Sequence, residues 1–220
     1  MKIRDMFSEP DLQRIKDAVA KAEGNISGEI VPVMVERSGR YVSANYKGAI
    51  LCASFAFVVM IVFDRYVFTG AGNALFYDPV FIFFIVAVAG IAGGVIPSFS
   101  HPLKRLLAGR THLDLSSQQR AQNAFLEEEV FNTRQRTGIM IFISFFEHEV
   151  IVMADKGISS VVDKARWDEI VSDLIAHIRE EKVVEGLEKA IARCGAILLE
   201  KGFTKSEDDT NELRDDLRLE

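Results

Sequence analysis

The sequence has little cysteine and no surplus of positive charge, and each shortage excludes a class of protein. Its 220 residues include two cysteines, Cys52 and Cys194, which form neither a CxxC pair nor a metal-ligand spacing. A disulfide framework is therefore excluded. The 26 Lys and Arg residues against 32 Asp and Glu give a net charge of −6. Because neutralising phosphates needs clustered Lys and Arg, we expect no nucleic-acid partner.

Short motifs of the common enzyme classes are also missing from the sequence. No P-loop, GxGxxG, GxSxG or HExxH pattern occurs in it. The four histidines, His101, His112, His148 and His177, show no ligand spacing. This pattern favours a protein without catalytic activity over an enzyme.

Charged residues are missing from two long internal stretches, residues 48–63 and 79–99. A helix rises about 1.5 Å per residue, so roughly 20 residues span the hydrocarbon core of a bilayer. The second stretch also has no polar face that could turn toward water. We therefore predict two transmembrane helices, over residues 46–66 and 79–99, rather than two core helices of a soluble protein.

The two apolar helices are expected to form a hairpin. Gly90 and Gly94 form a GxxxG pair, and small residues let membrane helices approach closely. The pair fits contact within the hairpin, and it equally fits association with other membrane proteins or with a second copy of the chain. Six Lys and Arg flank the hairpin, whereas its connection holds only Arg65. The positive-inside rule then predicts that both termini are cytoplasmic. We expect the membrane to be a bacterial inner membrane.

Outside the hairpin, helical and strand patterns alternate. Ser8 and Asp11 form a capping box, and Pro32 inside the first strand suggests an edge position or a bulge. In chain order we expect a helix between Ser8 and Gly24, a strand over 28–36, a basic turn over 102–107, a helix over 117–134, strands over 139–146 and 149–154, and two helices between Asp163 and Gly202. Helices packed on a small mixed sheet define an α/β fold.

The order of these elements predicts a discontinuous domain. Residues 1–45 and 100–203 must meet to form one sheet, in which strands 28–36 and 139–146 are parallel because a helix joins them. The transmembrane hairpin interrupts this domain. Residues 204–220 hold seven acidic and three basic residues, so we expect a solvated acidic tail there.

Two aspartates are candidates for binding a divalent cation. Asp155 follows a strand and Asp163 begins a helix nearby. Open α/β sheets often bind ligands at strand ends, and carboxylates are the ligands that Ca²⁺ or Mg²⁺ prefers. The roles of turn residue and helix N-cap account for the same two residues without any metal.

Three stretches resemble the TPM-domain family, named for its thylakoid and photosystem II-associated members: FSEPDLQRIKDAVAKAEGNISGEI, RTGIMIFISFFEHEVIVMADKGI and WDEIVSDLIAHIREEKVVEGLEKAIARCGAILLEKGF. The resemblance implies a Rossmann-like α/β sandwich. The chain departs from the family in lacking an Asp-rich segment before the first helix. It also has Ala154-Asp155-Lys156-Gly157 where many members have GYG. The metal binding and phosphatase activity of the family therefore do not transfer by motif.

Two functions fit the sequence. The first is a membrane-anchored, TPM-like interaction or assembly module that faces the cytoplasm. The second is a divalent-metal-dependent, phosphatase-like hydrolase that uses acidic residues at the strand ends.

Overall fold

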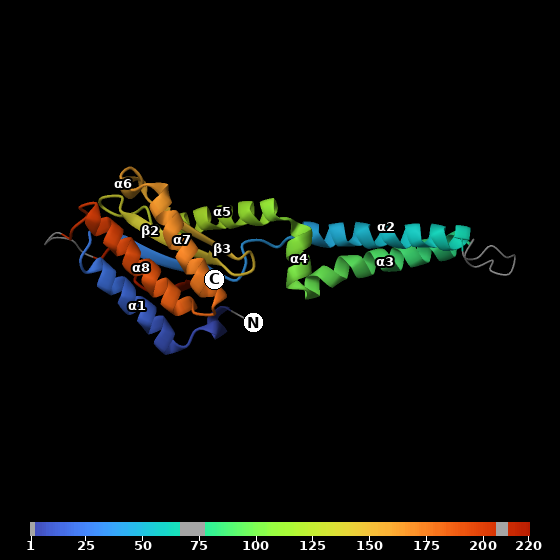
Figure 1. The fold of residues 1–220 in the computed structure, drawn as a ribbon, viewed down its shortest axis with the longest axis horizontal. Helices are drawn as coiled ribbons and strands as arrows, with labels where there is room; N and C mark the ends of the chain where they lie inside the picture. Colours follow the sequence, from blue (N-terminus) through green and yellow to red (C-terminus); the bar gives the residue numbers. More distant parts are fainter. Residues whose placement is uncertain (1–2, 67–77, 206–210) are drawn as a thin grey trace. The chain divides into compact units, whose positions relative to one another are not determined.

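The computed structural model describes residues 3–66, 78–205 and 211–220 (Figure 1). These residues form two compact units. The first combines Met1–Ser38 with Leu115–Glu220, and the second is Gly39–Asp114. Helix α5 (Arg110–Glu127) begins in the second unit and ends in the first.

A four-stranded sheet forms the centre of the first unit. Its order is β3 (Glu149–Ala154), β2 (Gly138–Ser144), β1 (Glu29–Val35) and β4 (Arg218–Leu219). β1 is parallel to both β2 and β4, whereas β2 and β3 are antiparallel. The predicted α/β class, with its small mixed sheet, is confirmed.

Helices cover both faces of this sheet, because alternate residues of a strand point to opposite sides. Ile30 and Met34 of β1 pack into a core with α1 (Glu9–Glu23), α7 (Lys164–Arg179) and α8 (Val183–Glu200). The intervening Val33 packs on the other face, against Ala121 and Ala124 of α5. The result is a three-layer α/β sandwich, completed by the short helices η1 (Ile3–Met6) and α6 (Lys156–Ser159).

The start of α1 confirms the predicted capping box. The Ser8 N–H donates to Asp11 Oδ2 at 3.0 Å, and the Asp11 N–H donates to Ser8 Oγ at 3.4 Å. Two of the backbone donors that every helix N-terminus leaves without a partner are satisfied in this way.

The prediction of a solvated tail is wrong for residues 211–220. Arg218 is buried, and β4 pairs with Val33 and Met34 of β1. Nε of Arg218 donates to Glu128 Oε2 at 2.8 Å, and the Glu212 N–H donates to Glu29 Oε1 at 3.0 Å. Composition predicted solvation here, but hydrogen bonds to these distant partners order the segment.

Pro32 lies in an inner strand, so its predicted edge position is wrong for β1 as a whole. On the side of β1 that faces β4, the Glu36 N–H donates to the Glu220 carbonyl and the Ile30 N–H to Glu23 Oε1. Pro32, like Ile30 and Glu36, is an even-numbered residue of the strand, so its backbone faces the same side of β1. It lies before Val33 and Met34, the two residues of β1 that pair with β4. Its missing N–H therefore costs no ladder hydrogen bond.

The second unit contains the two apolar helices. α2 (Val42–Tyr66) includes the predicted span 46–66, and α3 (Pro79–Phe99) coincides with the predicted span 79–99. Both are long and apolar enough to cross a membrane. The predicted basic turn is instead a helix, α4 (His101–Ala108), which Pro102 starts and Gly109 ends.

Small residues let α2 and α3 approach closely within the chain. Gly90 and Gly94 lie against Ala53 and Ala49 of α2, with 3.4 Å between the position of an added Cβ and each alanine Cβ. At Gly93 an added Cβ would lie only 2.5 Å from the Cβ of Cys52. The GxxxG pair thus serves the hairpin itself.

Candidate functional site

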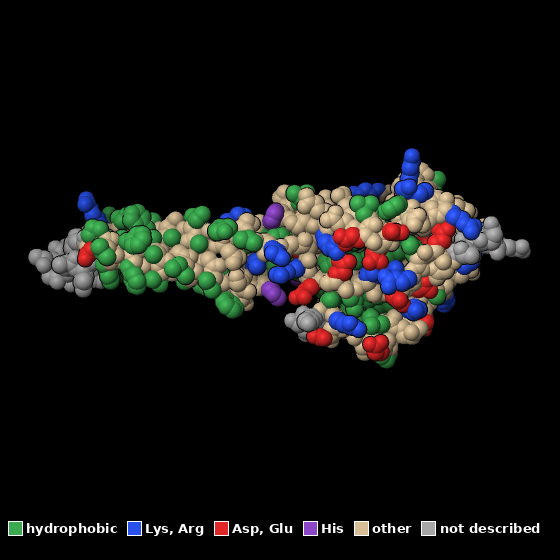
Figure 2. Space-filling view, turned by 180° about the vertical axis from the view of Figure 1, so that it is seen from behind, with side chains coloured by type: hydrophobic (Ala, Val, Ile, Leu, Met, Phe, Trp, Pro, Cys, Tyr) green, Lys and Arg blue, Asp and Glu red, His purple; other side chains and the backbone are tan. Residues whose placement is uncertain are grey.

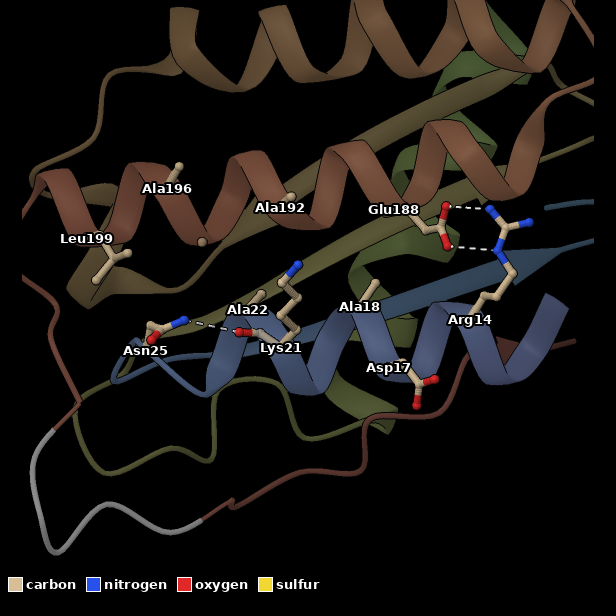
Figure 3. Close-up of a pocket in the computed structure, with 11 residues that line it drawn as sticks. Arg14, Asp17, Ala18, Lys21, Ala22, Asn25, Glu188, Ala192, Ala196 and Leu199 are labelled. Carbon is tan, nitrogen blue, oxygen red and sulfur yellow. Dashed lines mark hydrogen bonds and ion pairs between the residues drawn. The ribbon is translucent and has the colours of Figure 1, made fainter. Parts of the chain in front are cut away.

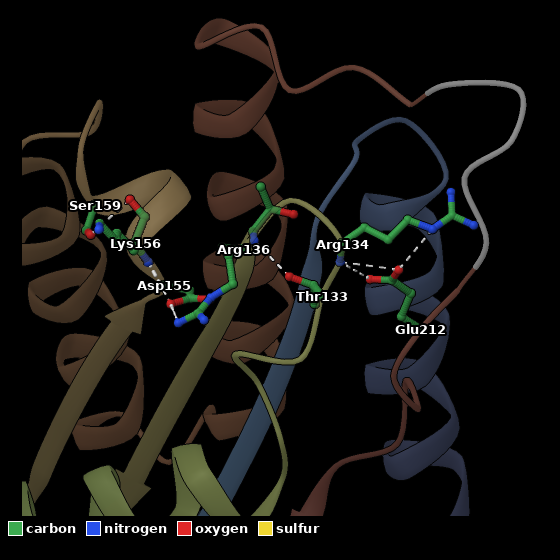
Figure 4. Close-up of polar contacts among 8 residues, drawn as sticks. Thr133, Arg134, Arg136, Asp155, Lys156, Ser159 and Glu212 are labelled. Atoms are coloured by element: carbon green, nitrogen blue, oxygen red, sulfur yellow. Dashed lines mark hydrogen bonds and ion pairs between the residues drawn. The ribbon is translucent and has the colours of Figure 1, made fainter.

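Asp155 is held by an arginine that lies 19 residues earlier in the sequence (Figure 4). Arg136 donates to it through both Nε, 2.5 Å from Oδ2, and Nη2, 2.9 Å from Oδ1. The Lys156 N–H also donates to Oδ1 at 2.7 Å, so Asp155 caps α6. Burial raises the pKa of Asp155, but the hydrogen bonds from Arg136 and Lys156 outweigh burial and leave the pKa below its usual value. Both carboxylate oxygens are therefore occupied by protein donors.

Asp155 directly follows β3, as the sequence indicates, but this end of the sheet is the one at which the parallel strands begin. The Asp155 N–H donates to the Gly138 carbonyl at 2.9 Å, and Gly138 begins β2 beside Glu29 of β1. Because β3 is antiparallel to β2, Asp155 lies at the amino ends of the parallel strands. Ligands of open α/β sheets bind at the carboxyl ends.

Asp163 occupies the N-cap position of α7, as predicted, but its side chain makes no capping hydrogen bond. Within residues 3–66, 78–205 and 211–220, no group of three or more His, Cys, Asp or Glu side chains has an arrangement that could hold a metal ion. The Ca²⁺ or Mg²⁺ site at Asp155 and Asp163 stays a prediction, and Arg136 is the group that a cation would have to displace.

A buried polar cluster that the sequence did not reveal lies at the carboxyl ends of β1 and β2. Glu147 Oε1 accepts the Ser38 N–H at 2.9 Å, and Ser144 Oγ donates to Glu147 Oε2. The hydroxyl oxygens of Ser38 and Ser144 are 2.9 Å apart. Glu147 is only 3% exposed, so this carboxylate closes the strand ends by satisfying groups of the chain itself. Ser38 and Glu147 are far apart in the sequence and meet only in the folded chain. The one signal for this cluster would have been burial of the turn between β2 and β3.

Two buried glutamates lie at the other end of the sheet, where β1 begins. Glu23 accepts the Ile30 N–H through Oε1 at 2.8 Å, and its Oε2 has no hydrogen-bond partner among the described residues. Glu29 accepts the N–H groups of Glu212 and Leu213. Burial raises the pKa of Glu23 to about 8; the Ile30 hydrogen bond opposes this shift, and the negative charge of Glu29 adds to it. Both glutamates line a small cavity of about 90 Å³.

A larger groove of about 520 Å³ runs between α1 and α8 (Figure 3). Its floor consists of small side chains: Ala18, Ala22, Ala192, Gly195 and Ala196. At one end, Arg14 donates to Glu188 through Nε at 3.0 Å and Nη2 at 2.8 Å. The Asn25 side-chain amide donates to the Lys21 carbonyl at 3.3 Å near the other end of the groove. The groove therefore combines small apolar groups with charged side chains.

His177 does not form the ion pair with Asp173 that its spacing permits. Its Nδ1 lies 2.8 Å from the Asp173 carbonyl, and its Nε2 lies 2.8 Å from Lys189 Nζ. The Asp173 carboxylate pairs instead with Arg193. These residues line a cavity of about 250 Å³ between α7 and α8, but the hydrogen bonds account for them as links between the two helices.

The fold and this arrangement of polar groups define the class as an α/β sandwich domain with an inserted helical hairpin. Residues 108–197 match the model of the TPM domain family, which confirms the resemblance over that part of the chain. The structure is similar to the NMR structure of BA42 protein from the psychrophilic bacterium Bizionia argentinensis. That similarity has a TM-score of 0.59 at 18% identity, over 99% of this chain and 97% of the other, and it shows a shared fold. No curated protein matches the chain.

Proposed function

We propose that this protein is a TPM domain anchored in a membrane by α2 and α3, and that it acts as a cytoplasm-facing interaction or assembly module at a bacterial inner membrane. One observation carries the proposal. Only 6% of each apolar span is buried, whereas a core helix of a soluble protein is mostly buried. Figure 2 shows hydrophobic side chains over the hairpin surface. A bilayer removes this apolar surface from water, and each fully buried large apolar side chain gains about 1.5–3 kcal/mol.

Two features of the first unit support binding rather than catalysis. The carboxylates of Asp155 and Glu147 already accept hydrogen bonds from groups of the chain. The groove between α1 and α8 has small apolar side chains on its floor and charged residues at its rim, which is the pattern of a surface for a partner helix or loop.

Anchoring and topology are tested by cysteine labelling in a Cys52→Ala background, where the remaining Cys194 is fully buried. Gln13→Cys reports on the first unit and Tyr66→Cys on the far end of α2. In intact cells, a membrane-impermeant maleimide is expected to label Tyr66→Cys only, and permeabilisation should expose Gln13→Cys. Labelling of Gln13→Cys in intact cells contradicts the orientation, and release of the chain by alkaline carbonate contradicts the anchor.

The interaction role is tested by crosslinking in membranes followed by purification in mild detergent. The wild type should retain a stoichiometric partner protein or a second copy. Ala192→Glu places a charge on the groove floor and should release that partner, while Glu169→Gln on the exposed side of α7 should not. Recovery of the chain alone after crosslinking contradicts the proposal.

A phosphatase-like, divalent-metal-dependent hydrolase is the second candidate, and the observation in its favour is that the matching family is named for a phosphatase. The two candidates differ in their response to metal. A hydrolase centred on Asp155 predicts that Ca²⁺ or Mg²⁺ raises the melting temperature of the wild type and not that of Asp155→Ala. The interaction module predicts no metal-dependent shift in either protein.

A further inference from the structure

The short helix α4 has two chemically different sides. Leu103, Leu106 and Leu107 are three and four residues apart and share one side, whereas His101, Lys104 and Arg105 lie toward the other. Leu106 is 76% exposed and Phe99, just before the helix, is 86% exposed. These large apolar side chains have no cover within the described part of the chain.

The orientation of α4 relative to the hairpin is the second observation. Within the Gly39–Asp114 unit, α4 lies across the ends of α2 and α3 (Figure 1). Lys47 of α2 helps to fix this arrangement, because its Nζ donates to the Leu107 carbonyl at 2.9 Å and the Ala108 carbonyl at 3.3 Å. A cation at these last carbonyls also suits the negative end of the helix dipole. If α2 and α3 cross a bilayer, a helix that crosses their ends lies in the plane of the membrane surface.

Charge is distributed unequally between the two units. The Gly39–Asp114 unit contains six of the 26 basic residues but only three of the 32 acidic ones, so it carries +3 and the remainder of the chain carries −9. Figure 2 shows Lys, Arg and His side chains gathered at one end of the hairpin. Arg40, Lys104, Arg105 and Arg110 belong to the sequence at that end.

We propose that α4 is an interfacial helix that binds the headgroups of anionic phospholipids, with Lys104 and Arg105 at the phosphates and Leu103, Leu106 and Phe99 among the upper acyl chains. This proposal rests on the membrane anchor proposed above and adds a lipid class to it. Amphipathic helices with basic polar sides bind at this depth. Each Lys or Arg near an anionic surface strengthens binding roughly fivefold.

Native mass spectrometry of the full chain, released from micelles with equal amounts of phosphatidylglycerol and phosphatidylcholine, tests the proposal. The wild type should carry phosphatidylglycerol several-fold more often than phosphatidylcholine. Lys104→Gln and Arg105→Gln should each lower that ratio roughly fivefold. Arg65→Gln, which removes a charge at the other end of α2, is the matched control and should leave the ratio unchanged.

Two further arms separate a lipid from a free anion. Leu106→Gln keeps every charge and should weaken the phosphatidylglycerol adduct, because the acyl chains lose a contact. Inorganic phosphate at a large excess should not displace the adduct. Equal adducts of the two lipids, an unchanged ratio in both charge variants, or displacement by phosphate each overturns the proposal.

The proposal can fail without the membrane anchor failing. If all variants and the wild type stay in the membrane pellet after carbonate treatment while the lipid ratio is near one, only the lipid site is wrong. If the wild type itself is extracted by carbonate, the proposed anchor is wrong as well.

Discussion

The carboxyl group of Glu23 is buried in surroundings that make its ionisation unfavourable. It is 7% exposed, it accepts one backbone N–H, and its second oxygen has no hydrogen-bond partner among the described residues. The charged groups that face it are Glu29 and Asp215, which disfavour ionisation, and Lys205, which favours it. Burial and the nearby negative charges make the ionised form unfavourable, whereas a neutral carboxyl can still accept the Ile30 N–H. The folded state therefore favours the protonated form.

This environment predicts that the first unit loses stability as pH rises. An unfolded Glu titrates near 4.3, whereas Glu23 in the folded chain titrates near 8. Between these values the folded state binds more protons, so the free energy of unfolding falls with pH, by a few kcal/mol in total. Glu23→Gln keeps the acceptor and removes the titration. Thermal unfolding from pH 5 to pH 8 should therefore show a flatter profile in this variant, and an equally steep profile would contradict the assignment.

Asp155 and Asp163 are predicted to differ in their contribution to stability, although each begins a helix. Asp155→Ala removes the Arg136 hydrogen bonds and the cap on Lys156, and should cost about 1–2 kcal/mol. The Asp163 side chain makes no capping hydrogen bond. Asp163→Ala should therefore lower the free energy of unfolding by only a few tenths of the loss expected for Asp155→Ala. Denaturant unfolding of the two variants in parallel measures the difference. Equal losses would show that the Arg136 pair contributes little.

At the scale of the element, the hairpin depends on one point of close approach. An added Cβ on Gly93 would lie 2.5 Å from both the Cys52 Cβ and the Gly48 carbonyl oxygen, so α2 and α3 would have to move apart to make room for it. Gly93→Ala should therefore separate α2 from α3 and lower the melting temperature in detergent markedly, at a cost of about 1–3 kcal/mol.

The neighbouring Gly94→Ala is the matched control for this prediction. Its added Cβ would lie 3.4 Å from the Ala49 Cβ, which is ordinary contact, so its melting temperature should stay close to that of the wild type. Equal tolerance of the two substitutions would mean that the helices are not packed as described.

Local patterns in the sequence predicted most elements, because each pattern had one physical solution. The β-branched run after Gly28 is buried along its whole length as β1, and the periodic face that begins at Trp167 is the buried side of α7. The uncharged run 79–99 coincides with α3. In each case burial of the same apolar face stabilises the structure that the pattern favours.

The elements that the sequence misidentified owe their structure to distant partners. The acidic composition of residues 211–220 predicted solvation, but Glu29 and Glu128 receive its backbone N–H groups and Arg218. α4 resembled a turn because it is short, and contact with α2 through Lys47 stabilises it. The candidate site was limited in the same way. Asp155 was found, but its partner Arg136 is recognisable only once β2 and β3 are paired.

At the scale of the whole molecule, the two units have opposite requirements for solvent. The first buries its own core between the sheet and four helices, and carries −9. The second exposes apolar side chains along both long helices, among them Phe55, Phe83 and Ile91. Every strand of the sheet comes from Met1–Ser38 or Leu115–Glu220, so no part of the hairpin is needed to complete it.

The first unit is therefore predicted to fold in plain buffer without the second. Replacing residues 39–114 by a flexible Gly/Ser linker changes the free energy of loop closure only slowly with length, by about 0.6 kcal/mol for each doubling. The shortened chain should be soluble without detergent and should unfold cooperatively, with the circular dichroism of an α/β domain. Met34→Asp in the same background places a charge in the core and should abolish that transition. A shortened chain that aggregates or lacks a cooperative transition would show that the sandwich depends on the inserted helices.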